Sequence, residues 1–214
     1  MLNIYTAALE GKLFIVQQVL EKEPEALNSH DEASGRSSGG HDELVSFLIK
    51  KGAAVDLKDD SGLTPLTIAA STGKDRVVEI LLDHGAQVNS QNESGQTALH
   101  YAASKNRLQI AEHLLKHNAD VNIPNDIKQL PIHRAAAQGY TALVKLLLKH
   151  GSRLNPMDGE RNTPLHLACE EGHGDTAALL LEEGADADRV NGDGKTPVDL
   201  CSKELKSFLA QHLE

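Results

Sequence analysis

Histidines recur at a fixed interval along this 214-residue chain. His100, His133 and His166 are evenly spaced, and histidine is a common ligand of zinc. Positions in one repeat register lie on successive units, about 8–10 Å apart where helices pack, whereas the ligands of one zinc ion lie about 2 Å from it. Two other units carry Thr67 and Asp199 at this position, which would interrupt a row of ligands. We therefore expect no metal site and no bound cofactor, and a structural role for these histidines.

Three other short motifs match known binding patterns only in part. The hexapeptide NGDGKT, residues 191–196, is similar to a phosphate-binding loop, but Arg189 stands where that loop needs its first glycine. The segment DADRVNGDG, residues 186–194, lacks the carboxylate spacing of an EF-hand loop. Asn92-Glu93-Ser94 is a glycosylation sequon by pattern, but the chain shows no signal peptide that would bring it to modification. No Ser-His-Asp, Cys-His or paired-carboxylate set stands out, so the sequence predicts a protein that is not an enzyme.

Composition and charge narrow the classes of partner. The net charge is −10, from 31 acidic and 21 basic residues, so nucleic acid is repelled and a basic protein partner is favoured. The chain contains no run of about 18 apolar residues, so we expect no membrane span. The segment from Met1 to Glu10 lacks the pattern of a secretory signal. Cys169 and Cys201 are too few for a disulfide framework, so we expect free thiols. These features predict an intracellular protein that binds neither nucleic acid nor membrane, with the cytoplasm and the nucleus as its two expected locations.

A 33-residue repeat organises the chain. One landmark is a segment similar to Thr-Pro-Leu-His, and the other is a pair similar to Gly-Ala. The first landmark starts at residues 64, 97, 130, 163 and 196, and the second at residues 52, 85, 118, 151 and 184. Two independent landmarks with one period indicate a repeat protein, in which each unit contacts its neighbours.

The landmarks also predict where helices begin and end. Thr before Pro supplies an N-cap hydroxyl, and Pro suits the first helical position because an N–H would have no partner there. We expect this first helix to end at residues that tolerate the left-handed backbone, namely Gly73, Asn106, Gly139 and Gly172. A second helix follows, and its end carries a histidine suited to the negative end of the helix dipole, at His84, His117 and His150. A turn rich in Asp, Asn and Gly then predicts a projecting hairpin.

These units resemble ankyrin repeats, each a helix pair plus a β-turn. The resemblance implies an all-α solenoid of helix pairs with β-hairpin fingers, about seven units in all, in which stacking buries the apolar stripes. It implies one domain over residues 1–214, with an N-terminal unit over 1–27, a truncated second unit over 28–51, regular repeats over 52–200 and a C-terminal cap over 201–214. It also implies that the recurrent histidine makes structural hydrogen bonds near the helix cap. Such a fold would bind proteins on its concave face, and we expect a monomer.

The second unit is shorter than the others. Counting back one repeat period from Gly73 and from Gly85 reaches Gly40 and Gly52, so GGHDELVSFLIKKGAAVD matches a second helix and its exit. Residues 28–39 hold a single alanine and no larger apolar residue, so they cannot supply a buried first helix. The simplest interpretation is that about seven residues of the repeat are missing between Arg36 and Ser37. An alternative transcript, a gene-model gap and true divergence would each explain the loss.

Particular sequence strings make the resemblance to ankyrin-repeat proteins more specific. Four of them are similar to strings of gankyrin-like proteins, the ankyrin-repeat chaperones and non-ATPase subunits of the proteasome regulatory particle. They are LHYAASKNR (99–107), IHRAAAQG (132–139), GAQVN (85–89) and NTPLHLACEE (162–171). The resemblance covers about residues 1–214 and is most specific over 52–172. It implies that the concave face holds the C-terminal domain of a proteasomal AAA ATPase subunit during assembly of the 19S regulatory particle.

The resemblance also implies which residues would bind the partner. Arg36 and Lys105 correspond to cationic contacts for acidic ATPase residues, and Asp60 and Glu171 to anionic contacts for basic ones. The expected partner-binding set is completed by Tyr101, Arg107 and Glu170. An ordinary solvated charge is the alternative interpretation for each charged residue.

Two further partners follow from partial resemblances. Leu167, Cys169 and Glu171 match the LxCxE pattern by which several proteins, gankyrin-like ones included, are thought to engage the retinoblastoma protein. That motif is read as an extended peptide, whereas residues two apart on a helix point about 200° apart, so we favour a repeat-core role. A binder and inhibitor of cyclin-dependent kinase, of the ankyrin type, is the alternative function, because such proteins also have a reduced first helix in their second unit. A cell-cycle adaptor is a further alternative.

Overall fold

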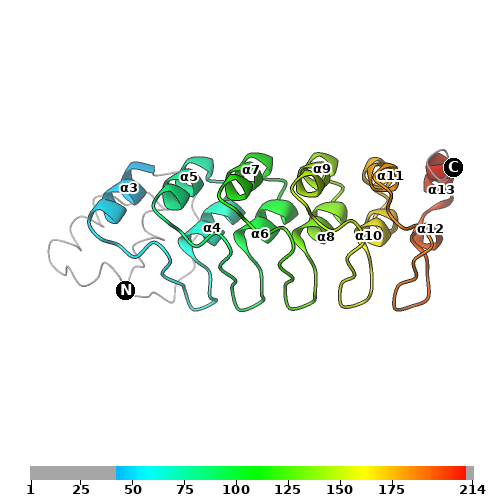
Figure 1. The fold of residues 1–214 in the computed structure, drawn as a ribbon, viewed down its shortest axis with the longest axis horizontal. Helices are drawn as coiled ribbons and strands as arrows, with labels where there is room; N and C mark the ends of the chain where they lie inside the picture. The colour runs from blue at the N-terminus through cyan, green and yellow to red at the C-terminus, as the bar shows by residue number, and fades with distance from the viewer. Residues whose placement is uncertain (1–41, 211–214) are drawn as a thin grey trace.

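The described part of the chain is a row of helix pairs. The computed structural model describes residues 42–210. The expected N-terminal unit, the truncated stretch that precedes residue 42, and Arg36 therefore lie outside the described residues. In Figure 1 the pairs stand side by side from α3 at one end to α13 at the other. Within residues 42–210, no helix is long and apolar enough to span a membrane.

Helices of two kinds alternate along this row. The inner helices lie next to the loops, and the outer helices lie on the far side from the loops (Figure 1). The inner helices are α4 (Pro65–Thr72), α6 (Ala98–Ser104), α8 (Pro131–Ala136), α10 (Pro164–Glu170) and α12 (Pro197–Leu200). The outer helices are α3 (Asp42–Lys50), α5 (Asp75–Asp83), α7 (Leu108–Lys116), α9 (Thr141–Lys149), α11 (Gly174–Glu182) and α13 (Lys203–Leu209). The fold is therefore all-α over the described residues.

The inner helices begin where the Thr-Pro pattern predicts. The Thr64 hydroxyl accepts the N–H of Thr67 at 3.2 Å, which satisfies one of the free donors of the first turn. Leu130 has no hydroxyl that could accept a hydrogen bond from the first turn. There the helix supplies the acceptor instead, because Nδ1 of His133 accepts the backbone N–H of Leu130 at 3.0 Å. The predicted helix ends are also confirmed, since positive φ angles occur at Gly73, Asn106, Gly139 and Gly172.

Histidines close the ends of three outer helices, as expected. Nδ1 of His84 donates to the carbonyl of Ile80 at 2.7 Å, and Nδ1 of His150 donates to the carbonyl of Leu146 at 2.9 Å. These carbonyls belong to the last turn, and each also accepts the backbone N–H of the same histidine at 3.2 Å. The ring therefore adds a second hydrogen bond to this carbonyl, at the negative end of the helix dipole.

Where β-hairpins were predicted, residues 42–210 form closed loops and contain no strands. Two backbone bonds close each loop, for example from the N–H of Asn92 to the carbonyl of Gln96 and from the N–H of Gly95 to the carbonyl of Asn92, both at 3.0 Å. The Asn92 side chain replaces further ladder bonds, because its Oδ1 accepts the N–H groups of Ser94 at 3.1 Å and Gln96 at 2.8 Å. Five loops repeat this side-chain arrangement, at Asp59, Asn92, Asn125, Asp158 and Asn191.

Backbone hydrogen bonds tie each loop to the next. The carbonyl of Ser94 accepts the N–H of Asp126 at 3.2 Å, and the carbonyl of Ile127 accepts the N–H of Gly159 at 2.9 Å. The Asn122 side chain adds two contacts across one junction, accepting the N–H of Arg153 at 3.0 Å and donating to the carbonyl of Gly151 at 3.0 Å. The loops are therefore positioned by their neighbours as much as by their own turns.

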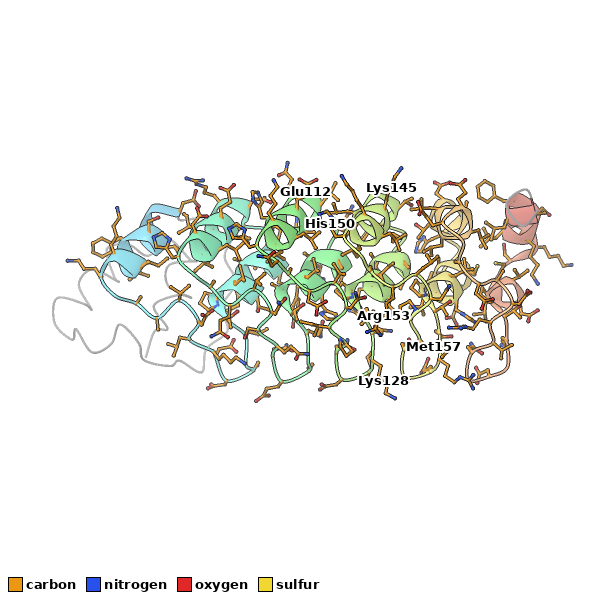
Figure 2. The ribbon with its side chains drawn as sticks, viewed as in Figure 1. Glu112, Lys128, Lys145, His150, Arg153 and Met157 are labelled. Atoms are coloured by element: carbon orange, nitrogen blue, oxygen red, sulfur yellow. The ribbon has the colours of Figure 1, made fainter. Side chains whose placement is uncertain are left out.

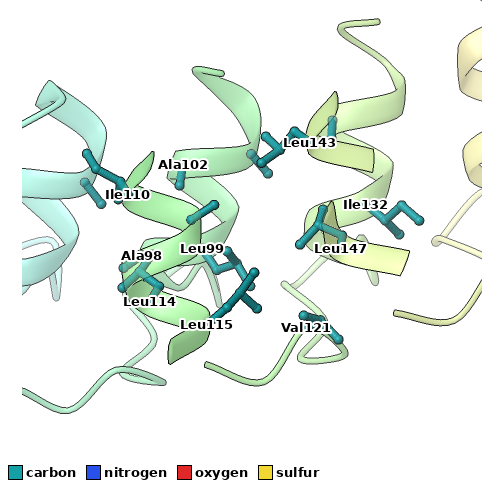
Figure 3. Packing of buried hydrophobic residues seen from close by; sticks show 14 of the residues in the cluster. Ala98, Leu99, Ala102, Ile110, Leu114, Leu115, Val121, Ile132, Leu143 and Leu147 are labelled. Atoms are coloured by element: carbon teal, nitrogen blue, oxygen red, sulfur yellow. The ribbon is translucent and has the colours of Figure 1, made fainter. Parts of the chain in front are cut away.

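The core is one continuous cluster of small and medium aliphatic side chains. Paired alanines on the inner helices, such as Ala102 and Ala103, are fully buried and allow helices of adjacent units to approach closely. Leucines of the outer helices, such as Leu114 and Leu147, fill the space between the two rows (Figure 3). Each unit thus buries its apolar face only against its neighbours, as expected for a solenoid protein.

Two glycines of one unit offer a matched stability test. Gly85 and Gly95 have φ angles of +83° and +71°, so an alanine at either position pays the cost of a left-handed backbone, about 1–2 kcal/mol. A Cβ at Gly85 meets no atom within 4 Å, whereas a Cβ at Gly95 would lie 2.9 Å from the backbone nitrogen of Asp126. We expect Gly95→Ala to lose about 1–3 kcal/mol more than Gly85→Ala in urea unfolding. Equal losses would contradict the close approach of the two loops.

The last described unit departs from the regular repeat. Its inner helix α12 spans only Pro197–Leu200, and Ser202 then caps α13 by accepting the N–H of Leu205 at 3.1 Å. A Cβ at Gly174, the first residue of α11, would lie 3.2 Å from atoms of Leu205 and of Phe208. The missing side chain at Gly174 therefore lets α13 pack closely against α11.

Candidate protein-binding face

One face of each inner helix remains open to solvent. On α6, the residues that face the core are buried, whereas Tyr101 and Ser104 are partly buried and Lys105 is exposed. The same positions recur once per repeat on the neighbouring inner helices. We call this set the inner stripe, and it consists of Ile68, Ser71, Thr72, Tyr101, Ser104, Lys105, Arg134, Ala137, Gln138, Leu167, Glu170 and Glu171.

The inner stripe changes charge along the row. Lys105 caps the end of α6 and Arg134 lies on α8, so the middle of the stripe is positive. Glu170 and Glu171 end α10 and are exposed, so the stripe is negative towards the C-terminal units. A protein that binds along this stripe would therefore need acidic groups opposite α6 and α8 and basic groups opposite α10.

The other expected site residues lie apart from the inner stripe. Asp60 is exposed in the first described loop. Arg107 is the N-cap residue of α7, and its guanidinium covers the end of α4, where a Cβ at Gly73 would lie 2.6 Å from Cζ of Arg107. Arg107 would therefore have to break this contact between units before it could bind a partner. Arg36 lies outside the described residues.

Two side chains of the inner stripe are held by hydrogen bonds from the loops. The Tyr101 hydroxyl accepts a hydrogen bond from Nδ2 of Asn92 at 3.0 Å. Burial raises the pKa of Tyr101, while the bond from Asn92 and the positive charge of Arg134 act in the opposite direction. Arg134 donates from one terminal nitrogen to Oε1 of Gln129 at 3.4 Å.

Comparison with protein families identifies the repeat. A model described as ankyrin repeats (3 copies) matches residues 33–125 and 132–211, and a second, described as ankyrin repeats (many copies), matches residues 105–148. The chain belongs to the ankyrin-repeat family. A search of curated proteins gave no match to this chain. Ankyrin repeats imply a role in protein–protein interaction and generally act as non-enzymatic scaffolds, and the matched models include no catalytic family.

The ankyrin histidines form the structural bonds expected of them. In the unit of α6, Nδ1 of His100 accepts the N–H of Thr97 at 3.2 Å, so the proton lies on Nε2, which donates to the carbonyl of Gln129 at 3.0 Å. His133 and His166 make the same two kinds of contact. Burial lowers the pKa of His100 to about 4 and also lowers the pKa of His133 and of His166. Among residues 42–210, no group of three or more His, Cys, Asp or Glu side chains is placed to hold a metal ion.

Two of the LxCxE residues of this ankyrin chain lie on a helix, and the third, Glu171, is the C-cap of that helix. Leu167 and Cys169 belong to α10, and Cys169 is only 1% exposed. Both cysteines are free, and burial raises the pKa of the Cys169 thiol, with the neighbouring Cys201 raising it further. An extended presentation of this motif would require α10 to unwind and the Cys169 side chain to leave the core.

Arg134 is one of the inner-stripe residues that were not among the expected partner-binding residues. It stands one repeat period after Tyr101 and one period before Leu167, so the repeat register already indicates that Arg134 shares their position in the unit. What the register could not show is that this position is partly open to solvent on each inner helix. Ile68 and Gln138 were missed for the same reason.

Proposed function

We propose that this ankyrin-repeat protein is a gankyrin-like chaperone, which holds the C-terminal domain of a proteasomal AAA ATPase subunit while the 19S regulatory particle assembles. The observation that carries the proposal is the inner stripe, whose charge runs from positive at Lys105 and Arg134 to negative at Glu170 and Glu171. The strings shared with gankyrin-like proteins support it. We further propose that the protein acts as a monomer in the cytoplasm and nucleus.

The mechanism needs no catalysis. The chaperone would cover the ATPase domain in a one-to-one complex and prevent its early docking on the core particle. Paired charges along the stripe would mainly set specificity and association rate, because exposed ion pairs add little net affinity in water. Binding should therefore weaken as the salt concentration rises.

Charge reversal on the stripe tests the proposal. In a pull-down with the ATPase C-terminal domain, we expect Lys105→Glu combined with Glu171→Lys to weaken binding about tenfold to a hundredfold, because two attractive contacts become repulsive. The double change leaves the net charge of the protein unaltered. Each residue is exposed at the end of an inner helix, so the fold should be retained.

A matched control lies on the outer helices. Glu112→Lys combined with Lys145→Glu reverses two exposed charges on α7 and α9, far from the loops (Figure 2), and should leave retention of the ATPase domain unchanged. Equal loss in both double variants would contradict binding along the inner stripe. Capture of a cyclin-dependent kinase without the ATPase domain would favour the inhibitor function instead.

A further inference from the structure

The Tyr101 hydroxyl is free to donate a hydrogen bond. Oδ1 of Asn92 is occupied by the N–H groups of Ser94 and Gln96, so the atom facing Tyr101 is the amide nitrogen, which can only donate. The Tyr101 oxygen is thus the acceptor of that bond, and its own hydrogen must point elsewhere. Since Tyr101 is on the inner stripe, the hydroxyl can donate to a group that enters from solvent.

Arg134 is held in place with donors to spare. Nε2 of Gln129 donates to Oδ2 of the buried Asp158 at 3.2 Å, which leaves Oε1 of Gln129 to accept from Arg134. No carboxylate within residues 42–210 pairs with Arg134, although it is partly buried and the protein as a whole is acidic. A guanidinium carries five N–H donors in a fork that matches a carboxylate, so most of its donors are available.

Tyr101, Lys105 and Arg134 occupy neighbouring positions of the inner stripe. Lys105 follows Tyr101 by four residues, which is one helical turn, and Arg134 occupies the position of Tyr101 on the adjacent, packed helix α8. The charges of Arg134 and of Asp59 both act on the Tyr101 hydroxyl. The buried His100 and His133 are neutral at pH 7 because burial lowers the pKa of each. The cluster therefore offers three donor groups and a net charge of about +1 once Asp59 is counted.

We propose that Tyr101, Lys105 and Arg134 form a receptor for one carboxylate, supplied by a Glu or Asp side chain in an acidic segment of a partner protein. This inference rests on the proposed function only in that it uses the same protein-binding face. A monoanion suits a cluster of charge about +1 better than a phosphate dianion does, because Asp59 would repel the second charge. The planar guanidinium would bind both carboxylate oxygens, and the Tyr101 hydroxyl would bind one of them from the side.

A short acidic peptide tests the receptor directly. The probe is acetylated, amidated hexaglutamate, titrated into the full chain while the backbone N–H resonances of Ser104 and Lys105, which every variant retains, are followed by NMR. We expect Arg134→Gln to raise the dissociation constant about tenfold or more, and Tyr101→Phe, which deletes only the hydroxyl, to raise it about three- to tenfold. Arg134→Lys keeps the charge but loses the fork, so it should restore only part of the affinity. The control Lys145→Gln removes an equal charge from the outer side of α9 (Figure 2) and should change binding by less than about twofold.

Several outcomes would overturn the receptor. Equal weakening by Lys145→Gln and Arg134→Gln would mean unspecific charge attraction, and unchanged binding in Tyr101→Phe would remove the hydroxyl from the site. Tighter binding, by tenfold or more, of the same peptide with phosphoserine in place of two glutamates would reject the monoanion assignment.

The receptor and the chaperone role can fail separately. Retention of the ATPase domain with no effect of Arg134→Gln or Tyr101→Phe would reject the receptor and keep the proposed function. Specific hexaglutamate binding without any retention of the ATPase domain would support the receptor and reject that function. Thermal unfolding of each variant within a few degrees of the wild type shows that a loss of binding is not a loss of fold.

Discussion

Acidification from pH 7 to pH 4 is expected to lower the free energy of unfolding by about 3 kcal/mol through His100 alone, with further losses through His133 and His166. The pKa of His100 is about 4 in the folded protein against 6.5 for an unperturbed histidine. The unfolded chain therefore binds a proton at a higher pH than the folded protein does. The stabilisation is fully present above pH 6.5 and is lost as the pH falls towards 4.

Urea unfolding at a series of pH values between 7 and 4 measures this effect. The chain supplies its own control, because one unit carries Thr67 in place of the histidine, and there the Thr64 and Thr67 hydroxyls contact each other at 2.9 Å. His100→Thr should copy that arrangement. We expect the variant to be less stable at pH 7, since Gln129 loses its donor, but to lose less stability on acidification. An unchanged pH dependence in His100→Thr would contradict the buried neutral state of His100.

Leu147→Ala is expected to remove about 2–5 kcal/mol from the free energy of unfolding. Leu147 is fully buried on α9, between the helix pairs of the middle of the row (Figure 3). Truncation there removes apolar contacts and leaves a cavity that the surrounding helices fill only in part. Because both neighbouring units depend on this junction, the loss should also reduce the cooperativity of unfolding.

The residue next to Leu147 is the natural control. Leu148 is on the same helix but only partly buried, so Leu148→Ala removes the same atoms from a more open site. Chemical unfolding of both variants in urea should show a clearly smaller loss for Leu148→Ala, of about 1 kcal/mol. Similar losses in the two variants would mean that the outer row is packed less tightly than its burial indicates.

Most of the fold follows from local chemistry that recurs in every repeat. Thr before Pro starts an inner helix at Thr64 and Thr163, and a glycine with left-handed backbone ends one at Gly73 and Gly172. These signals act over a few residues, so they can be read without knowing what the unit packs against. The loops were predicted less well, because Asx side chains such as Asn92 take over bonds that a hairpin would make between strands.

The candidate site depended on contacts between units. Arg134, Gln129 and Asp158 belong to loops and helices of two successive repeats, and the Tyr101 hydroxyl is oriented by an asparagine in the loop that precedes its helix. The repeat period shows which residues share a register, but exposure and hydrogen-bond partners arise only when the units stack. For this reason the helix pairs and the protein-binding class could be predicted from the sequence. The environment of Arg134 could not, because its partial burial and its lack of a carboxylate partner among the described residues are visible only in the folded chain.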